Sequence, residues 1–223
     1  MIYDVAILIS LERREDRANQ VKEHLKKRGI KNLYTFPAYD GKLIPEWVSI
    51  KPPHRSYFSW NKLNQYQIAC TLSHVGAMKM AKGLGAKRAL IFEDDAILCK
   101  DFTKRLEIFE EESLEINLDW DHVYFGGVPK GKTTQVTDHI YESQFTDGLH
   151  AYLVSEDGMK KVSDEMLKFN TTNDDAVNDL LTKKELNSYI FLPLSSYQKA
   201  DFSELDQKFS FRKEMLKYYK EEL

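Results

Sequence analysis

Short apolar runs alternate with segments of helical periodicity along most of this chain, and this alternation constrains the fold more than any other feature. Residues 4–10 are apolar enough for a strand buried on both faces. Residues 14–28 carry apolar side chains at helical spacing, and Gly29 supplies a stop at the carboxyl end. The same reasoning predicts further strands at 32–36, 88–92, 121–126, 150–154 and 188–192, and further helices at 65–82, from 155, from about 174 and from Gln207.

Strands that alternate with helices predict an α/β fold, with a mostly parallel central sheet flanked by helices and right-handed crossovers between the strands. We expect one domain over residues 1–205 and a C-terminal helical tail over 206–223, which is rich in Lys and Glu. The connection at 37–64 is long and rich in Pro, Trp and Tyr, which is unusual in a compact domain unless the connection covers a site as a lid.

Composition limits the classes of function. The 223 residues include 32 basic and 35 acidic side chains, so the formal charge of −3 gives no global attraction to nucleic acid or to an anionic membrane. Two cysteines, Cys70 and Cys99, are too few for a disulfide framework or a Cys-based zinc site. The N-terminal apolar run is too short for a signal peptide or a membrane span. We therefore expect a cytoplasmic protein without an integral membrane segment.

Three consecutive acids, Glu93, Asp94 and Asp95, follow the predicted strand at 88–92. Ligands of open α/β sheets bind beyond the carboxyl ends of strands. In an extended chain, Glu93 and Asp95 point to one side and Asp94 to the other. Two neighbouring carboxylates repel unless one is protonated or a cation lies between them, and a hard divalent ion such as Mg²⁺ or Mn²⁺ suits oxygen ligands. The alternative is a solvated acidic turn that caps the next helix.

The segment GGVPKGKT offers a competing interpretation, because Gly126, Gly131, Lys132 and Thr133 have the spacing of a phosphate-binding loop. That mechanism requires a helix to begin at the Lys and Thr. The following residues, TTQVTDHIYES, are β-branched and instead predict a strand or hairpin. We therefore interpret this segment as a solvated loop.

The order of several motifs resembles that of glycosyltransferase family 25, the lipooligosaccharide and collagen-type sugar transferases. The similarity extends over about residues 5–205, with Ser10 and Glu15 as departures from the usual Asn and Pro. It is carried by ISLERREDR (9–17), FPAYDG (36–41), QIACTLSH (67–74), IFEDDAIL (91–98), DHVYFGG (121–127), HAYLVSEDGMKK (150–161), NDDAVNDLL (173–181), Gln198 and Ser203.

The resemblance implies a GT-A-like, Rossmann-like single domain that uses a nucleotide-sugar donor, a UDP-sugar, with Mn²⁺ (or Mg²⁺) as cofactor. It implies that Glu93 and Asp95 hold the metal. Family members invert the anomeric centre, which requires a base for the acceptor hydroxyl group, and Asp174 and Asp175 are the candidates. The residues expected to contact the donor are Ser10, Leu11, Arg14, Arg17, His74 and Asp94, and those expected to contact the acceptor or other substrate groups are His150, Tyr152 and Gln198.

Each of these roles has a structural alternative. The arginines suit an ordinary charged helix start, Asp174 and Asp175 suit the first turn of a helix through its dipole, and a lone His74 in a core helix is often structural.

The sequence thus predicts a metal-dependent inverting glycosyltransferase that moves a hexose, galactose being favoured and a deoxyhexose remaining open, to a hydroxyl group of a glycan acceptor. The acceptor is expected to be lipid- or protein-linked, and a lipid-linked one would bring the enzyme transiently to a membrane. Two alternatives remain: a catalytically inactive nucleotide-sugar or glycan binding module, and a metal-dependent phosphohydrolase or nucleotidyl enzyme.

Overall fold

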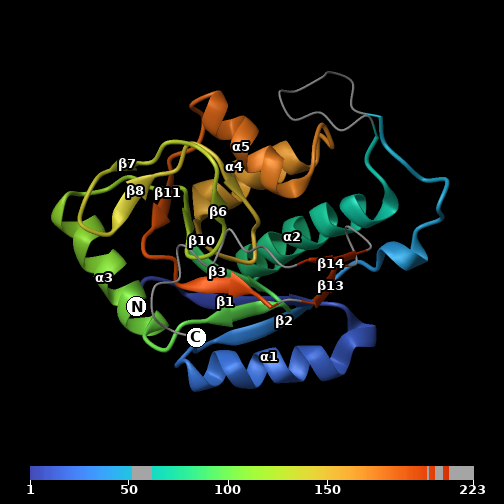
Figure 1. Cartoon of the computed structure of the whole chain (residues 1–223), viewed down its shortest axis with the longest axis horizontal. Coiled ribbons are helices and arrows are strands. Elements are labelled where there is room, and N and C mark those ends of the chain that lie inside the picture. The colour runs from blue at the N-terminus through green and yellow to red at the C-terminus, as the bar shows by residue number, and fades with distance from the viewer. Residues whose placement is uncertain (52–61, 200, 204–207, 211–223) are drawn as a thin grey trace.

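An eight-stranded sheet forms the centre of the computed structural model, which describes residues 1–51, 62–199, 201–203 and 208–210 (Figure 1). The strand order is β2-β1-β3-β10-β5-β11-β8-β7. The strands span Val5–Ser10 (β1), Leu33–Pro37 (β2), Arg88–Glu93 (β3), His122–Tyr124 (β5), Thr134–Gln135 (β7), Ile140–Glu142 (β8), Ala151–Ser155 (β10) and Ser188–Phe191 (β11).

The sheet is mixed, although six of its eight strands share one direction. β1 pairs in parallel with β2 and β3, and β5 pairs in parallel with β11. β10 runs antiparallel between β3 and β5, and β8 runs antiparallel beside β11 and β7. No helix lies between β5 and β10 to carry the chain back across the sheet, so β10 re-enters from the carboxyl end of β5 and runs the opposite way. The predicted α/β fold, with a central sheet flanked by helices, is confirmed, and the sheet itself is mixed.

Helices cover both faces of the sheet (Figure 1). α2 (Gln65–Gly83), α4 (Glu156–Met166) and α5 (Asn173–Thr182) pack on one face, and α1 (Glu15–Lys27) and α3 (Phe102–Glu115) pack on the other. The strands divide between these two cores by simple alternation: Ile7 and Ile9 of β1 join the α2 side, and Leu8 joins the α1 side. This alternation also governs where the acidic residues after β3 point.

Local signals fix the helix ends. The Asn64 side chain accepts hydrogen bonds from the N–H groups of Tyr66 and Gln67 at the start of α2, and the Gln67 side chain accepts one from the Asn64 N–H, which completes a capping box. The Ser155 hydroxyl accepts the Gly158 N–H at the start of α4. Beyond α1, Gly29 has φ +81°, the left-handed conformation expected after a helix.

Shorter elements lie around the sheet. Three two-stranded pairs are antiparallel, and two 3₁₀ turns follow β1 and β2. The pairs are β4 (Ala96–Leu98) with β12 (Ser196–Gln198), β6 (Val128–Pro129) with β9 (Thr146–Asp147), and β13 (Asp201–Ser203) with β14 (Lys208–Ser210), and the turns are η1 (Glu12–Arg14) and η2 (Gly41–Leu43).

Several expectations can be compared with these elements. The segment after Lys132 forms the β7–β8 hairpin, which agrees with our interpretation of the GKT sequence as a loop rather than a phosphate-binding helix start. The helix α3 was not predicted, although Phe102, Leu106 and Phe109 are spaced along one face of it. The expected tail helix lies mostly outside the described residues, and its described part, 208–210, is the strand β14. Residues 52–61 of the expected lid also lie outside the described residues.

A buried histidine predicts how stability depends on pH. His122 is fully buried beside the rings of Tyr124 and Tyr152, and burial lowers its pKa from 6.5 to about 3. The folded state therefore keeps His122 neutral while the unfolded chain takes up a proton below pH 6.5. The free energy of unfolding should fall as the pH drops from about 6.5 toward 3, with a contribution from this residue of up to about 1.4 kcal/mol per pH unit.

Urea denaturation between pH 7 and 4 measures this slope. Asn at position 122 retains a polar atom near the Ser188 hydroxyl, which lies 3.2 Å from Nδ1 of His122. His122→Asn should lower stability at pH 7 yet flatten the dependence on pH. An unchanged slope in the variant would contradict the assignment.

Candidate functional site

The three acids at the end of β3, of which Glu93 is its last residue, separate onto different sides of the sheet. Phe92 packs in the core that faces α1 and α3, so the next side chain, Glu93, points toward α2. There Oε1 of Glu93 lies 3.0 Å from Nε2 of His74. Asp94 points toward α1, where its Oδ2 accepts the Ser10 hydroxyl at 2.9 Å and its Oδ1 lies 3.0 Å from Nε of Arg17. Local alternation thus sends neighbouring carboxylates to different partners.

Asp95 has weaker partners than its two neighbours. Its Oδ2 lies 3.5 Å from Nη2 of Arg17 and accepts a hydrogen bond from Nε2 of Gln198 at 3.4 Å. Its backbone carbonyl accepts the Lys199 N–H at 2.8 Å, which fixes the turn beside β12. Its Oδ1 is buried and has no hydrogen-bond partner among the described residues. A buried carboxylate oxygen without a partner is costly, so it marks a place where a ligand would bind favourably.

The electrostatics of the acids point to a cation. Burial raises the pKa of Asp95 well above its usual range, and the Glu93 and Asp94 carboxylates raise it further, against the opposing effect of Arg17. Burial is the largest single effect on Glu93 and would raise its pKa, but the hydrogen bond from His74 and the charges of His74, His150 and Arg17 together lower the pKa. A divalent cation between Glu93 and Asp95 would relieve this repulsion and satisfy the bare oxygen. The donor set of hard oxygens therefore fits the expected Mn²⁺ or Mg²⁺.

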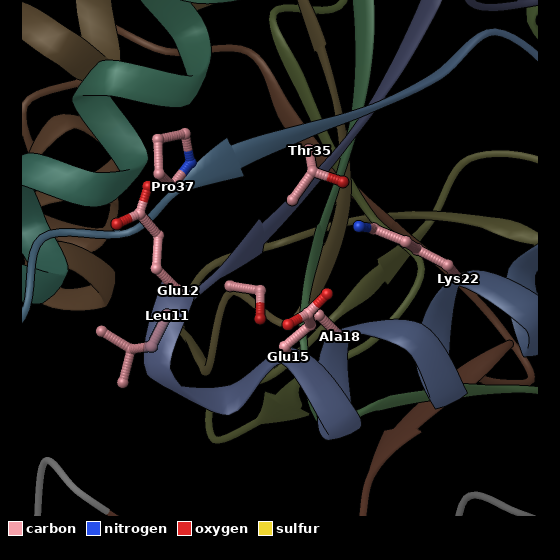
Figure 2. Close-up of a pocket in the computed structure, with 8 residues that line it drawn as sticks. Leu11, Glu12, Glu15, Ala18, Lys22, Thr35 and Pro37 are labelled. Atoms are coloured by element: carbon pink, nitrogen blue, oxygen red, sulfur yellow. The ribbon is translucent and has the colours of Figure 1, made fainter.

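A pocket lies between α1 and the strands β1 and β2 (Figure 2). Its volume is about 420 Å³, and Ser10, whose hydroxyl binds Asp94, is part of its wall. The charged lining includes two acids and one lysine, so the pocket suits a neutral group with hydroxyls better than a phosphate. The lining residues are Ser10, Leu11, Glu12, Glu15, Ala18, Lys22, Thr35 and Pro37.

The residues expected to contact the nucleotide-sugar donor lie in two groups. Ser10 and Leu11 line the pocket, whereas Arg17 binds the acids, its Nε also reaching the Asp94 carbonyl at 2.9 Å. Arg14 lies near enough to Asp94 to lower the pKa of that carboxyl group, although burial still leaves the pKa raised. These arginines are more than an ordinary charged helix start, because they offset the charge of the acidic cluster.

A buried layer supports Glu93 from beneath. His74 is 1% exposed, and its Nδ1 lies 3.0 Å from the hydroxyl of Tyr152, which is fully buried. His150 is also fully buried: its carbonyl accepts the Glu93 N–H at 3.0 Å, and its Nε2 lies 3.3 Å from the Ser196 carbonyl. The structure thus places His150 and Tyr152 in the interior, which differs from the acceptor contact expected of both.

Asp174 and Asp175 occupy the first turn of α5, as expected from their helix-start pattern. Oδ1 of Asp174 accepts the Thr172 hydroxyl at 2.8 Å, and its Oδ2 accepts the Gly148 N–H at 3.3 Å. Oδ2 of Asp175 accepts the hydroxyls of Thr171 and Thr172 at 3.3 and 3.0 Å. These bonds position both carboxylates by the turn that precedes the helix.

Sequence reasoning missed Cys70, whose sulfur lies within 4.8 Å of ligand atoms of His74 and Glu93. Burial raises the pKa of its thiol, and the carboxylates of Glu93, Asp174 and Asp95 raise it further. The spacing of four residues between Cys70 and His74 on one helix was the signal that could have identified the pair.

A comparison with protein families identifies the family of the chain. The family described as "Glycosyltransferase family 25 (LPS biosynthesis protein)" matches residues 4–181, which include every acid discussed above. The chain belongs to glycosyltransferase family 25. The resemblance of its ordered motifs is thereby confirmed.

Curated relatives of this family 25 chain include catalytic and inactive proteins. "Procollagen galactosyltransferase 1-A" of Xenopus laevis is 27% identical over 178 residues, which are 73% of this chain and 28% of the relative. "Probable inactive glycosyltransferase 25 family member 3" of Rattus norvegicus is 30% identical over 132 residues, 56% of this chain and 23% of the relative. The match thus spans about a quarter of the length of these relatives.

Among solved structures, A197 from STIV is similar, with a TM-score of 0.48, 14% identity and 92% coverage of both chains. Within the described ranges, the helices are all too short or too polar to cross a bilayer.

The strained carboxylate predicts a stability trade-off. Asp95→Asn removes a charge that burial and two neighbouring acids disfavour, so it should raise the melting temperature of the metal-free protein by about 2–4 °C, for roughly 1 kcal/mol. Calorimetry at pH 7 with a chelator measures this change.

Glu165→Gln is the matched control. Glu165 is also buried, but it accepts hydrogen bonds from Lys168 and Lys183 at 2.6 and 2.8 Å, and these bonds lower its pKa despite burial. Its substitution should lower the melting temperature. A fall in both variants would show that the charge of Asp95 is not strained.

Proposed function

We propose that this family 25 chain is a metal-dependent inverting glycosyltransferase of GT-A type, which moves a hexose from a UDP-sugar to a hydroxyl group of a glycan acceptor. Galactose is the favoured hexose, in line with the relatives named procollagen galactosyltransferase. The observation that carries the proposal is the bare, buried Oδ1 of Asp95 beside Glu93, next to a pocket of about 420 Å³.

Glu93 and Asp95 would hold the Mn²⁺ or Mg²⁺ ion. When bound, such an ion neutralises the charge that develops on a departing nucleoside diphosphate. The protein fixes the two carboxylates from opposite sides: His74 binds Glu93 at 3.0 Å, and Arg17 and Gln198 bind Asp95 at 3.5 and 3.4 Å. His74 is in turn positioned by Tyr152. Tyr152 and Arg17 are thus positioning residues for the metal ligands.

The pocket between β1, β2 and α1 suits the nucleoside of the donor. Its acids, Glu12 and Glu15, accept hydrogen bonds from hydroxyl or imide N–H groups and repel phosphates. A nucleoside in this pocket would lie beside Ser10, so its diphosphate would extend toward Arg14, Arg17 and the acids. The arginines then add positive charge near the leaving group.

Asp174 is the better placed of the two candidate bases. Its negative charge, like those of Glu93 and Asp95, acts on the Cys70 thiol and raises the pKa of that group. Oδ2 of Asp174 receives a single long hydrogen bond of 3.3 Å among those described, whereas Oδ2 of Asp175 receives two hydroxyl groups. In the proposed step, Asp174 takes the proton of the acceptor hydroxyl, whose oxygen bonds to the anomeric carbon as the bond to the diphosphate oxygen breaks. Attack opposite the leaving group inverts the centre.

A panel of nucleotide sugars with Mn²⁺ tests the function. We expect slow release of UDP from one UDP-hexose, UDP-galactose being favoured, and its loss in Asp95→Ala and with a chelator. Binding of UDP-sugars without release would instead support the alternative of an inactive binding module, which the inactive relatives favour. Full activity of Asp95→Ala would refute the metal role.

The base is tested by a matched pair of variants. Asp174→Asn should lower kcat for transfer by about 10²–10⁴, because a positioned base contributes that much, and should leave the affinity for UDP unchanged. Asp175→Asn should retain most of its activity. Calorimetric UDP binding and transfer kinetics measure the two effects. The reverse pattern would assign the base to Asp175.

A further inference from the structure

One cluster in the site contains ligand types that the proposed transferase does not use together. Cys70 and His74 lie one turn apart on α2, so their side chains emerge from the same face of the helix. Glu93 ends β3, the strand that reaches this face from below. The sulfur of Cys70, a ring nitrogen of His74 and a carboxylate oxygen of Glu93 all lie within 4.8 Å of one another.

This set of one thiol, one imidazole and one carboxylate matches the preference of a borderline-soft metal. Zn²⁺ binds sulfur at about 2.3 Å and nitrogen or oxygen at about 2.0–2.2 Å, which puts tetrahedral ligands roughly 3.5 Å apart. Rotation of the Cys70 and Glu93 side chains, both partly exposed, would close the observed separation. Hard ions such as Mg²⁺ do not favour a thiolate, so the cluster discriminates between metal classes.

The buried surroundings orient the imidazole for such a role. Nδ1 of His74 lies 3.0 Å from the Tyr152 hydroxyl, and the two rings stack with centroids 5.8 Å apart. When Nδ1 carries the proton, it donates a hydrogen bond to the Tyr152 oxygen. Nε2 then presents its lone pair toward Glu93 and Cys70. A hydrogen bond from the distal ring nitrogen is the usual outer support of a metal-binding histidine.

The local charge also favours a cation. The negative charges of Glu93, Asp174 and Asp95 all act on the Cys70 thiol and raise its pKa. A hydrogen bond between His74 and Glu93 accounts for those two residues without any metal, but it does not account for the Cys70 sulfur within 4.8 Å of both.

We propose that Cys70, His74 and Glu93 form a binding site for Zn²⁺ or a similar soft divalent transition metal. Binding releases the thiol proton to solvent, and the metal takes the place of the hydrogen bond between His74 and Glu93. Three protein ligands leave a fourth position for water. The site does not rest on the proposed transfer activity, because metal binding can be measured without turnover. It shares Glu93 with the proposed donor-metal site.

Zinc affinity, measured by competition with a chelating dye, tests the site. The wild-type chain should bind one equivalent of Zn²⁺, and Cys70→Ser should weaken the affinity at least about 100-fold, because even outer partners of ligands contribute 10- to 100-fold. Tyr152→Phe should weaken it by about 10-fold. Cys99→Ser is the matched control and should not change it, since Cys99 packs against the core on the opposite face of the sheet.

A second measurement uses the unaltered chain and so does not depend on the folding of a variant. Zn²⁺ should protect Cys70, but not Cys99, from alkylation by iodoacetamide, and Co²⁺ should produce a thiolate-to-cobalt charge-transfer band. Equal alkylation of both cysteines with and without Zn²⁺, or equal zinc affinity of wild type and a folded Cys70→Ser chain, would overturn the site. Neither experiment measures transferase activity, so a failure of the proposed function would not change the outcome of either one.

Discussion

The site depends on keeping three consecutive carboxylates apart. Like charges at adjacent positions would repel strongly in a partly buried turn. A cationic group or a hydrogen-bond donor on each side of the sheet offsets this repulsion. Arg17 holds Asp94 and reaches Asp95 from α1, while His74 holds Glu93 from α2. Because β1 and β3 are parallel neighbours, the start of α1 necessarily lies beside the end of β3. The fold itself therefore delivers Arg17 to the acids.

Periodicity was enough to predict most of the framework. The strands β1, β3 and β11 and the helices α1, α2 and α4 lie close to where apolar spacing and capping residues put them. The direction of β10 could not be predicted from the sequence, because an apolar run is compatible with parallel and with antiparallel pairing. Direction depends on which edge of the sheet the chain re-enters, and that is set by the excursion after β5. The helix α3 could have been predicted from the spacing of Phe102, Leu106 and Phe109. The acidic residues of the same segment obscured this apolar pattern.

The site was predictable where a residue sits at a strand end and less so within elements. Ser10, Asp94, Asp95 and Gln198 converge because strand ends on one edge meet. His150 and Tyr152 were expected to contact the acceptor, but both side chains are fully buried, Tyr152 within β10 and His150 directly before it, so they lie beneath the site. Cys70 was overlooked because its significance comes only from its neighbours in space, one of which is distant in sequence.

The reversed strand β10 has a consequence for evolution within the family. Residues 126–149 connect β5 to β10 and include β7 and β8, which form one edge of the sheet beside β11, and Gly148 within them donates to Asp174. Both strands that bracket this excursion are already paired with neighbours. Its length and composition can diverge at this edge while β3, β10, β5 and β11 keep their pairing. A change in this segment can therefore occur without displacing the acids at the end of β3.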